Sequence, residues 1–125
     1  MIDFGAMLGG ATSIVASTAT LRAQIQWARI QDKPTDVDIL REGVWLPTQT
    51  VRIEYDSSKP SDASDASGIS AFKGMYVFGV RGHPTVPDLD IDGGDIFVLD
   101  DQEYTIISVN KRIIGQIQAY CEAVG

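Results

Sequence analysis

The sequence predicts a mainly β protein, a small antiparallel β-barrel of about six strands with a short N-terminal helix and long loops. The strongest observation is a predicted hairpin, in which the apolar run Ile96–Leu99 and the strand Tyr104–Val109 flank the polar reversal Asp100–Glu103. A further strand, Ile113–Val124, follows after a short turn. The second observation is an alternation of apolar and polar residues earlier in the chain, which is typical of half-buried strands. The predicted strands span residues 18–30, 48–56, 69–80, 95–100, 103–110 and 113–124.

Residues 2–16 carry apolar side chains at helical spacing, which predicts a short helix. Each glycine in this segment weakens the helix by about 1 kcal/mol relative to alanine, so the helix needs a packing partner. We therefore divide the chain into an N-terminal helical docking segment, residues 1–17, and a single β-barrel domain, residues 18–125. The segment lacks the basic start of a secretion signal and is too interrupted for a membrane span, so synthesis in the cytoplasm is expected.

The segments before the middle of the chain differ in their periodicity. Apolar residues alternate with polar ones from Leu21 to Trp27, which predicts a strand over residues 18–30. Residues 31–43 are polar, and we expect a long connection there with a helical turn near Val37–Arg41. The alternation then returns in the strand at residues 48–56.

Residues 56–68 form a low-complexity segment of small and polar residues. They have no large apolar side chain whose burial could offset an ordering entropy of about 1–2 kcal/mol per residue. We expect a flexible loop in the free protein. The next strand ends near Val80, and Arg81–Gly94 is predicted to be a second long loop, rich in aspartate and proline.

The composition limits the function classes. The chain has 125 residues, a net charge of −7 and an isoelectric point of about 4.4. This acidic balance argues against a protein that grips nucleic-acid phosphates, but it suits a surface past which DNA must slide. Cys121 is the only cysteine, so no intramolecular disulfide forms, and its apolar neighbours predict a small buried side chain.

The motif with the clearest chemical meaning is Asp88–Gly93, which matches the D-x-D-x-D-G opening of a calcium-binding loop. The twelfth position of that loop requires a bidentate glutamate, but here it is Leu99, so we expect no tight calcium site. The sequence also lacks the motifs of nucleophilic, metal-dependent and phosphate-binding enzymes. We therefore expect no catalytic residue, no cofactor and no metal.

The order of these features resembles the head–tail joining proteins of tailed bacteriophages, the head-completion or stopper proteins of the lambda type. An N-terminal helix, a first strand, a long mid-chain loop and a closing three-strand block follow one another in both. The matching segments are Met1–Phe4, Arg81, Gly94–Leu99, Glu103–Val109 and Gly115–Tyr120.

The resemblance implies a structural virion protein of the phage neck. Such a protein forms a homo-oligomeric ring, a hexamer or a dodecamer, between the portal or adaptor protein and the tail terminator or tail tube. DNA passes through the lumen without sequence-specific binding, and no membrane is involved. Two alternatives stay open: a tail terminator or tail-tube protein, and a calcium-stabilised β module of a surface adhesion protein.

Segments whose composition does not suit a self-contained core are the expected contact sites. The residues expected to contact partners are Ile2, Phe4, Met7, Leu8, Ser58, Lys59, Pro60, Asp62, Arg81 and His83. We also expect Asp100, Asp101 and Glu103, at the tip of the predicted hairpin, to face the channel and repel passing DNA.

Overall fold

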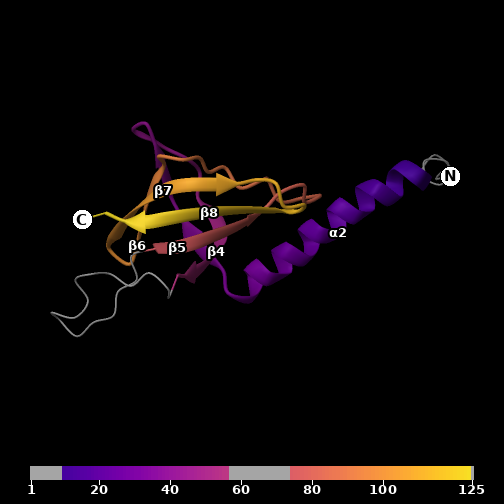
Figure 1. The fold of residues 1–125 in the computed structure, drawn as a ribbon, viewed down its shortest axis with the longest axis horizontal. Coiled ribbons are helices and arrows are strands. Elements are labelled where there is room, and N and C mark those ends of the chain that lie inside the picture. Colours follow the sequence, from indigo (N-terminus) through magenta and orange to yellow (C-terminus); the bar gives the residue numbers. More distant parts are fainter. Residues whose placement is uncertain (1–9, 57–73, 125) are drawn as a thin grey trace.

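The computed structural model describes the backbone of residues 10–56 and 74–124 and the side chains of residues 18–56 and 74–124. In this part the protein is mainly β, with a single helix and one antiparallel sheet (Figure 1). The elements are the helix α2 (Gly10–Asp32) and the strands β1 (Thr35–Val37), β2 (Ile39–Arg41), β3 (Val44–Trp45), β4 (Gln49–Tyr55), β5 (Gly74–Val80), β6 (Ile96–Leu99), β7 (Gln102–Asn110) and β8 (Gln116–Ala123).

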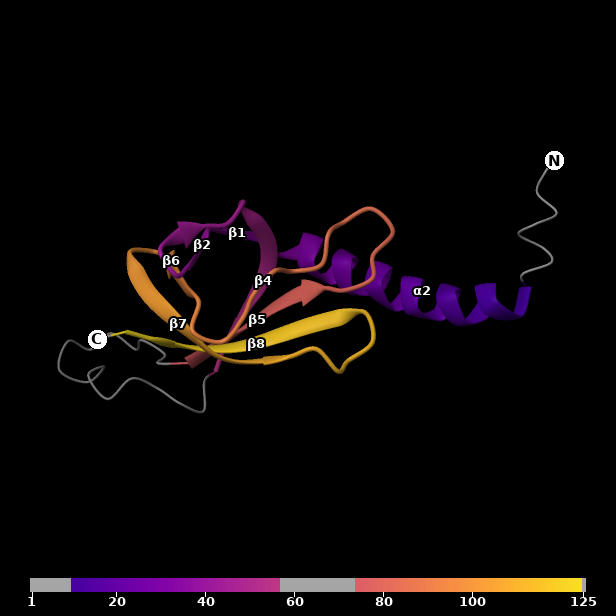
Figure 2. The ribbon, with the colours of Figure 1, turned by 90° about the horizontal axis from the view of Figure 1, so that it is seen from above.

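The eight strands form one sheet in the order β1-β4-β5-β8-β7-β6-β2-β3, and every pair is antiparallel. Four strands separate β1 from β6 in this order, yet the two are in contact, so the sheet curls on itself. Figures 1 and 2 show the resulting half-barrel, with α2 lying against one side of it. The predicted fold class, a small antiparallel barrel with a helix, is confirmed.

The core fills the inside of the half-barrel with apolar side chains from all but one of its strands. The Phe97 and Tyr104 rings stack at a centroid distance of 5.5 Å in the middle of it. Because a strand points alternate side chains to one face, each strand supplies every second residue. The buried cluster comprises Val37, Ile39, Val51, Ile53, Met75, Val77, Leu89, Ile91, Phe97, Tyr104, Ile106, Ile117, Ala119 and Cys121.

The prediction of a strand at residues 18–30 is wrong, because this segment is the second half of α2. The helix runs without interruption across residue 17, where the sequence suggested a domain boundary. Its buried residues, Ala23, Gln26 and Ile30, follow helical spacing and pack on the sheet. The alternation was misleading because Leu21 and Ile25, its other apolar members, are exposed.

The prediction of a long connection with a helical turn near Val37–Arg41 is also wrong. Strands β1, β2 and β3 lie in this region, and the described residues alone contain eight strands instead of about six. Strands of two or three residues bury too few side chains to produce an alternation, so sequence periodicity gives no signal for them. Glu42 and Gly43, both at positive φ, make the tight turn between β2 and β3.

The closing meander agrees with the prediction, since β6, β7 and β8 fall inside the expected ranges apart from one residue at the start of β7. Residues 1–9 and 57–73, which include the predicted start of the helix and nearly all of the expected flexible loop 56–68, lie outside the described part. Within the part that is described, no helix is both long enough and apolar enough to cross a membrane.

Gly115 fixes the helix against the barrel. It lies in the turn between β7 and β8 at a φ of +80°, and a Cβ atom built on it would be 2.7 Å from the backbone nitrogen of Ala23. The turn and the helix backbone therefore touch directly, which only glycine permits. This contact anchors the middle of α2, while Figure 2 shows its N-terminal half projecting beyond the barrel.

Candidate functional site

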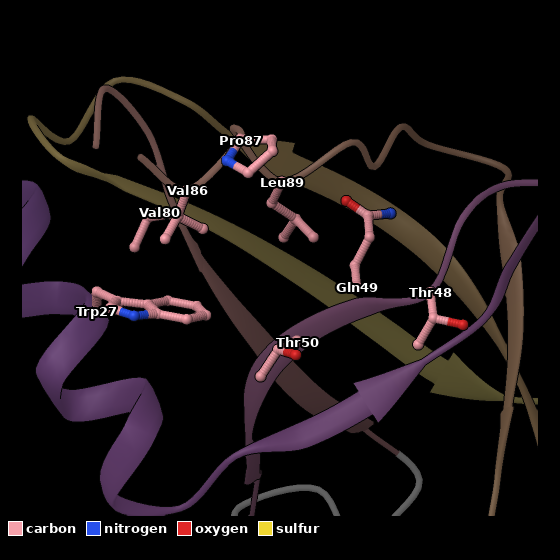
Figure 3. A pocket seen from close by; sticks show the side chains of 8 residues that line it. All are labelled: Trp27, Thr48, Gln49, Thr50, Val80, Val86, Pro87 and Leu89. Atoms are coloured by element: carbon pink, nitrogen blue, oxygen red, sulfur yellow. The ribbon is translucent and has the colours of Figure 1, made fainter. Parts of the chain in front are cut away.

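The loop Arg81–Gly94 and the face of α2 beside it form the candidate site. Trp27 projects from α2 towards Val80 and Val86, with Pro87 and Leu89 close by (Figure 3). They enclose a cavity of about 210 Å³ with a polar wall from the start of β4. We call this the Trp27 pocket; its lining residues are Trp27, Thr48, Gln49, Thr50, Val80, Val86, Pro87 and Leu89.

His83 holds the outer part of this loop in shape. Its Nδ1 atom accepts hydrogen bonds from the backbone N–H groups of Thr85, at 3.1 Å, and Val86, at 3.0 Å. Its ring also meets the Trp27 ring edge-to-face at a centroid distance of 6.2 Å. His83 therefore ties the loop both to itself and to α2, and Nδ1 is committed as an acceptor.

Gln49 fixes the inner part of the loop to the sheet. Its side-chain amide donates to the carbonyl oxygen of Asp90, at 2.9 Å, and accepts from the N–H of Asp90, at 2.7 Å. This paired contact imitates a strand ladder across a separation of 41 residues. Leu89 packs directly over Gly79, where a Cβ atom would be 2.5 Å from the Leu89 side chain. The Gln49–Asp90 hydrogen bonds and the Leu89–Gly79 contact therefore fix the shape of the pocket wall.

Arg41 organises the acidic half of the loop. Its Nη2 atom lies 2.9 Å from Asp90, 3.3 Å from Asp92 and 2.8 Å from Asp95, and its Nε atom is 3.0 Å from Asp95. The carboxylates of Asp95 and Asp90 raise the pKa of Arg41 further above its usual value, with the hydrogen bond to Asp95 as the main cause. We call this group the Arg41 clasp.

The clasp gives the aspartates of the D-x-D-x-D-G motif a different partner from calcium. A guanidinium lies between the carboxylates of the last two motif aspartates and Asp95. Asp95, at the start of the predicted strand 95–100, is only 3% exposed and also accepts a hydrogen bond from the N–H of Asp92. No group of three or more metal-ligating side chains suited to an ion occurs among the described residues.

The structure brings only part of the expected contact set together. Arg81 and His83 lie on the loop beside the Trp27 pocket, and Arg81 is tied to the β7–β8 turn through the carbonyl oxygen of Ile113. The acidic residues Asp100, Asp101 and Glu103 are exposed in and beside the β6–β7 turn, at the far end of β7. The remaining expected contacts, Ile2, Phe4, Met7, Leu8, Ser58, Lys59, Pro60 and Asp62, lie outside the described residues.

Cys121 is a core residue, as predicted. Its side chain is fully buried, and its thiol faces the carbonyl oxygen of Met75 at 3.4 Å. Burial raises the pKa of Cys121 to about 12, with a smaller effect from Glu122. The thiol therefore stays protonated at neutral pH and is a poor nucleophile.

Sequence reasoning missed Arg41, Gln49 and the role of Trp27. Trp27 was assigned to a strand, although the nearby Ala, Gln and Arg residues and the stop at Pro34 favour a helix. The partners of Arg41 and Gln49 lie 54 and 41 residues away, and no local pattern marks such contacts. Comparison with known proteins returned no family model, no characterised protein and no solved structure that matches this chain.

Proposed function

We propose that this chain is a structural protein of the neck of a tailed bacteriophage. It forms a ring that joins the DNA-filled head, at the portal or adaptor protein, to the tail terminator or tail tube. In the virion it helps to retain or gate the genome. The role requires assembly and no chemical turnover, and it rests on the sequence resemblance together with features of the structure that suit docking.

The observation that carries the proposal is the projection of α2 from the barrel (Figures 1 and 2). Most of the stability of a helix in a protein comes from tertiary packing of one face, and the projecting half of α2 has no such packing on the barrel. On its outer face Leu21 and Ile25 are 57% and 47% exposed and lie one turn apart. A helix that extends past its own core and presents apolar side chains is suited to insertion between neighbouring subunits.

The charge and the loop support the same role. An acidic ring does not hold DNA by pairing cations with its phosphates, so the genome can move through it. The loop that lines the Trp27 pocket is fixed by His83 and Gln49, which makes it a preorganised contact surface. A ring requires a heterologous interface, in which two different surfaces of the same chain meet.

The decisive experiment removes the chain from the phage that encodes it. We expect DNA-filled heads and free tails as separate particles, visible by electron microscopy, and restored joining when the purified protein is added. A double change, Leu21→Asp with Ile25→Asp, should leave the monomer folded and block the restoration. The change Val98→Asp, at a 50% exposed position on β6, is the matched control and should still restore joining.

Two outcomes contradict this proposal in different ways. If heads lacking the chain still carry tails, the joining role is wrong. If the tails themselves are absent or of uncontrolled length, the chain is a tube or terminator protein. Deletion of residues 57–67 tests the contribution of that segment separately, and we expect it to block joining while the protein stays soluble.

A further inference from the structure

A second cavity, of about 360 Å³, borders α2 at Gln26 and Arg29. It opens between the helix and the neighbouring strands β4, β5 and β8 and combines one aromatic wall with several polar groups. We call it the Gln26 socket; its lining residues are Gln26, Arg29, Arg52, Glu54, Phe78 and Gln116.

Gln26 gives the socket its chemical character. The residue is only 6% exposed, and its side-chain amide has no hydrogen-bond partner within the part of the chain that the structure describes. No buried side-chain nitrogen or oxygen among the described residues lacks a partner, so the Gln26 amide reaches water through the open socket. The side chain lines the cavity, so a ligand that enters the socket can replace this water as hydrogen-bond partner.

The arginines of the socket are not equivalent. Arg52 already pairs with Glu54 at 2.6 Å and donates to the carbonyl oxygen of Arg29 at 2.9 Å. The Arg29 side chain is exposed and, among the described residues, faces no carboxylate. Glu54 and Asp32 both lie beside Arg52, so Arg29 is the cation of the socket that has no carboxylate next to it among the described residues.

These groups select a carboxylate carried by a protein. A carboxylate is an acceptor only, and guanidinium and amide N–H groups are its matching donors. A nucleic acid needs several uncompensated cations, whereas here Glu54 and Asp32 compensate Arg52 and only Arg29 is left. The ligand is therefore a short acidic segment with one or two carboxylates.

The chain itself carries such a segment in the β6–β7 turn. Asp100 and Asp101 have φ values of 51° and 66°, which makes a tight turn with both side chains at its surface. Both residues are exposed, and neither carboxylate is paired with a cation in the described structure. The exposed acidic turn and the exposed Arg29 of the socket are complementary in charge and in hydrogen bonding.

The two sites cannot meet within one molecule. Strand β7 has nine residues and separates the β6–β7 turn from the β7–β8 turn, which leads into Gln116. At about 3.3 Å per residue this is a distance of roughly 30 Å. Figure 2 shows the two turns at opposite ends of the barrel.

We infer that the Gln26 socket binds the Asp100–Asp101 turn of a second copy of this chain, an inference that rests on the ring-forming function proposed above. The carboxylate of one copy accepts hydrogen bonds from Arg29 and Gln26 of the next. The contact is heterologous, so its repetition generates a ring where the rotation closes. The acidic turn then serves subunit contact instead of the channel lining that its sequence suggested.

Charge reversal at each site provides the test. The chains Arg29→Glu and Asp101→Arg should each self-associate about 10- to 100-fold more weakly than the wild type, because like charges then meet at the contact. An equimolar mixture of the two should regain assembly, since each turn finds an oppositely charged socket on the other variant. Sedimentation velocity at low ionic strength measures both effects. A further mixture of Arg29→Cys and Asp101→Cys chains should form an intermolecular disulfide under mild oxidation.

Matched controls change the same charges elsewhere. Lys33→Glu alters a cation just after α2, outside the socket, and Glu42→Arg alters an acid in another turn at a φ of 50°. Both should assemble like the wild type. Equal melting temperatures establish that the variants are folded.

Three results would overturn the inference: a wild-type chain that stays monomeric and gives no 29–101 disulfide, single reversals that assemble normally, or a mixture that stays dissociated. The head–tail joining assay is independent of these results. Joining lost without the chain but unaffected by the reversals would reject the socket alone. Socket-dependent assembly in a phage that joins its tails without the chain would reject the neck function alone.

Discussion

Replacing Arg41 by methionine is expected to be among the most destabilising single changes outside the apolar core. Methionine keeps much of the length and apolar stem of the side chain but removes the guanidinium. Asp95 is 3% exposed, so its carboxylate stays buried after the change. Its remaining partner is the N–H of Asp92, at 2.8 Å.

The size of the effect follows from which contacts of Arg41 are buried. The two hydrogen bonds to Asp95, at 3.0 and 2.8 Å, form a bidentate pair with a buried acid. The contacts to Asp90 and Asp92 involve side chains that are 57% and 56% exposed, so they contribute little. Removing one partner of a buried pair costs about 3–5 kcal/mol; because the Arg41 side chain is 28% exposed, we lower the expected loss of unfolding free energy to about 2–4 kcal/mol.

Urea denaturation followed by circular dichroism measures this loss, and the melting temperature should fall by about 10 °C. Arg52→Met is the matched control, since Arg52 is equally exposed at 28% but pairs with the 45% exposed Glu54. It should cost less than about 1 kcal/mol. In a double-mutant cycle with Asp95→Asn, the two changes should cost about 1–3 kcal/mol less together than their sum.

The reasoning fails if Arg41→Met costs no more than Arg52→Met. That result would mean that water replaces the guanidinium at Asp95, or that Asp95 becomes protonated at little cost. A coupling energy near zero in the double-mutant cycle would likewise show that the clasp contributes nothing as a pair.

Two further predictions concern the backbone and the core. Gly115→Ala should lower the unfolding free energy by about 2–4 kcal/mol, because the added Cβ atom would meet the helix backbone. Gly43→Ala is the control, also at a φ of +80° but with nothing within 4 Å, and should cost only about 1 kcal/mol. Equal losses in urea denaturation would show that α2 does not rest on the turn. Cys121 should resist thiol reagents at pH 8 in the native protein and react on unfolding, because burial raises its pKa to about 12. Since the folded pKa lies above the ordinary value of 9.0, the stabilisation from the protonated thiol is complete below pH 9 and is lost as the pH rises towards 12, and native-state labelling at pH 8 would contradict the burial.

The closing meander could be predicted because its signals are local. The polar reversal at Asp100–Asp101 stands between two apolar runs, and the alternation in β7 and β8 extends over several residues. Strands β1, β2 and β3 are too short for such a pattern, and they form because β4 and β6 offer ladders to them. Their position depends on the rest of the fold, which local periodicity does not describe.

The helix was missed because the apolar residues of this segment fit the two-residue period of a strand as well as the 3.6-residue period of a helix. Residues two apart in a strand, such as Leu21 and Ala23, can also be read as members of opposite helix faces. Which residues are buried depends on a tertiary contact. Gly115 lets the helix approach the β7–β8 turn, so Ala23 is buried there whereas Leu21 stays in solvent. The candidate sites were missed for a related reason, because Gln26, Phe78 and Gln116 meet only after α2 has docked on the sheet.

The acidic side chains of this chain fall into two groups with different physical consequences. Asp95 is neutralised by Arg41 inside the protein, so it stabilises the loop and adds little to the field outside. Asp100 and Asp101 have no cation beside them in the described structure and present their full charge to solvent. Only charges of the second group can repel DNA or attract another subunit, because only they remain uncompensated. The mixing experiment therefore also decides between the channel and the subunit contact for this turn, since a carboxylate held by Arg29 of a neighbour no longer faces the lumen as a free charge.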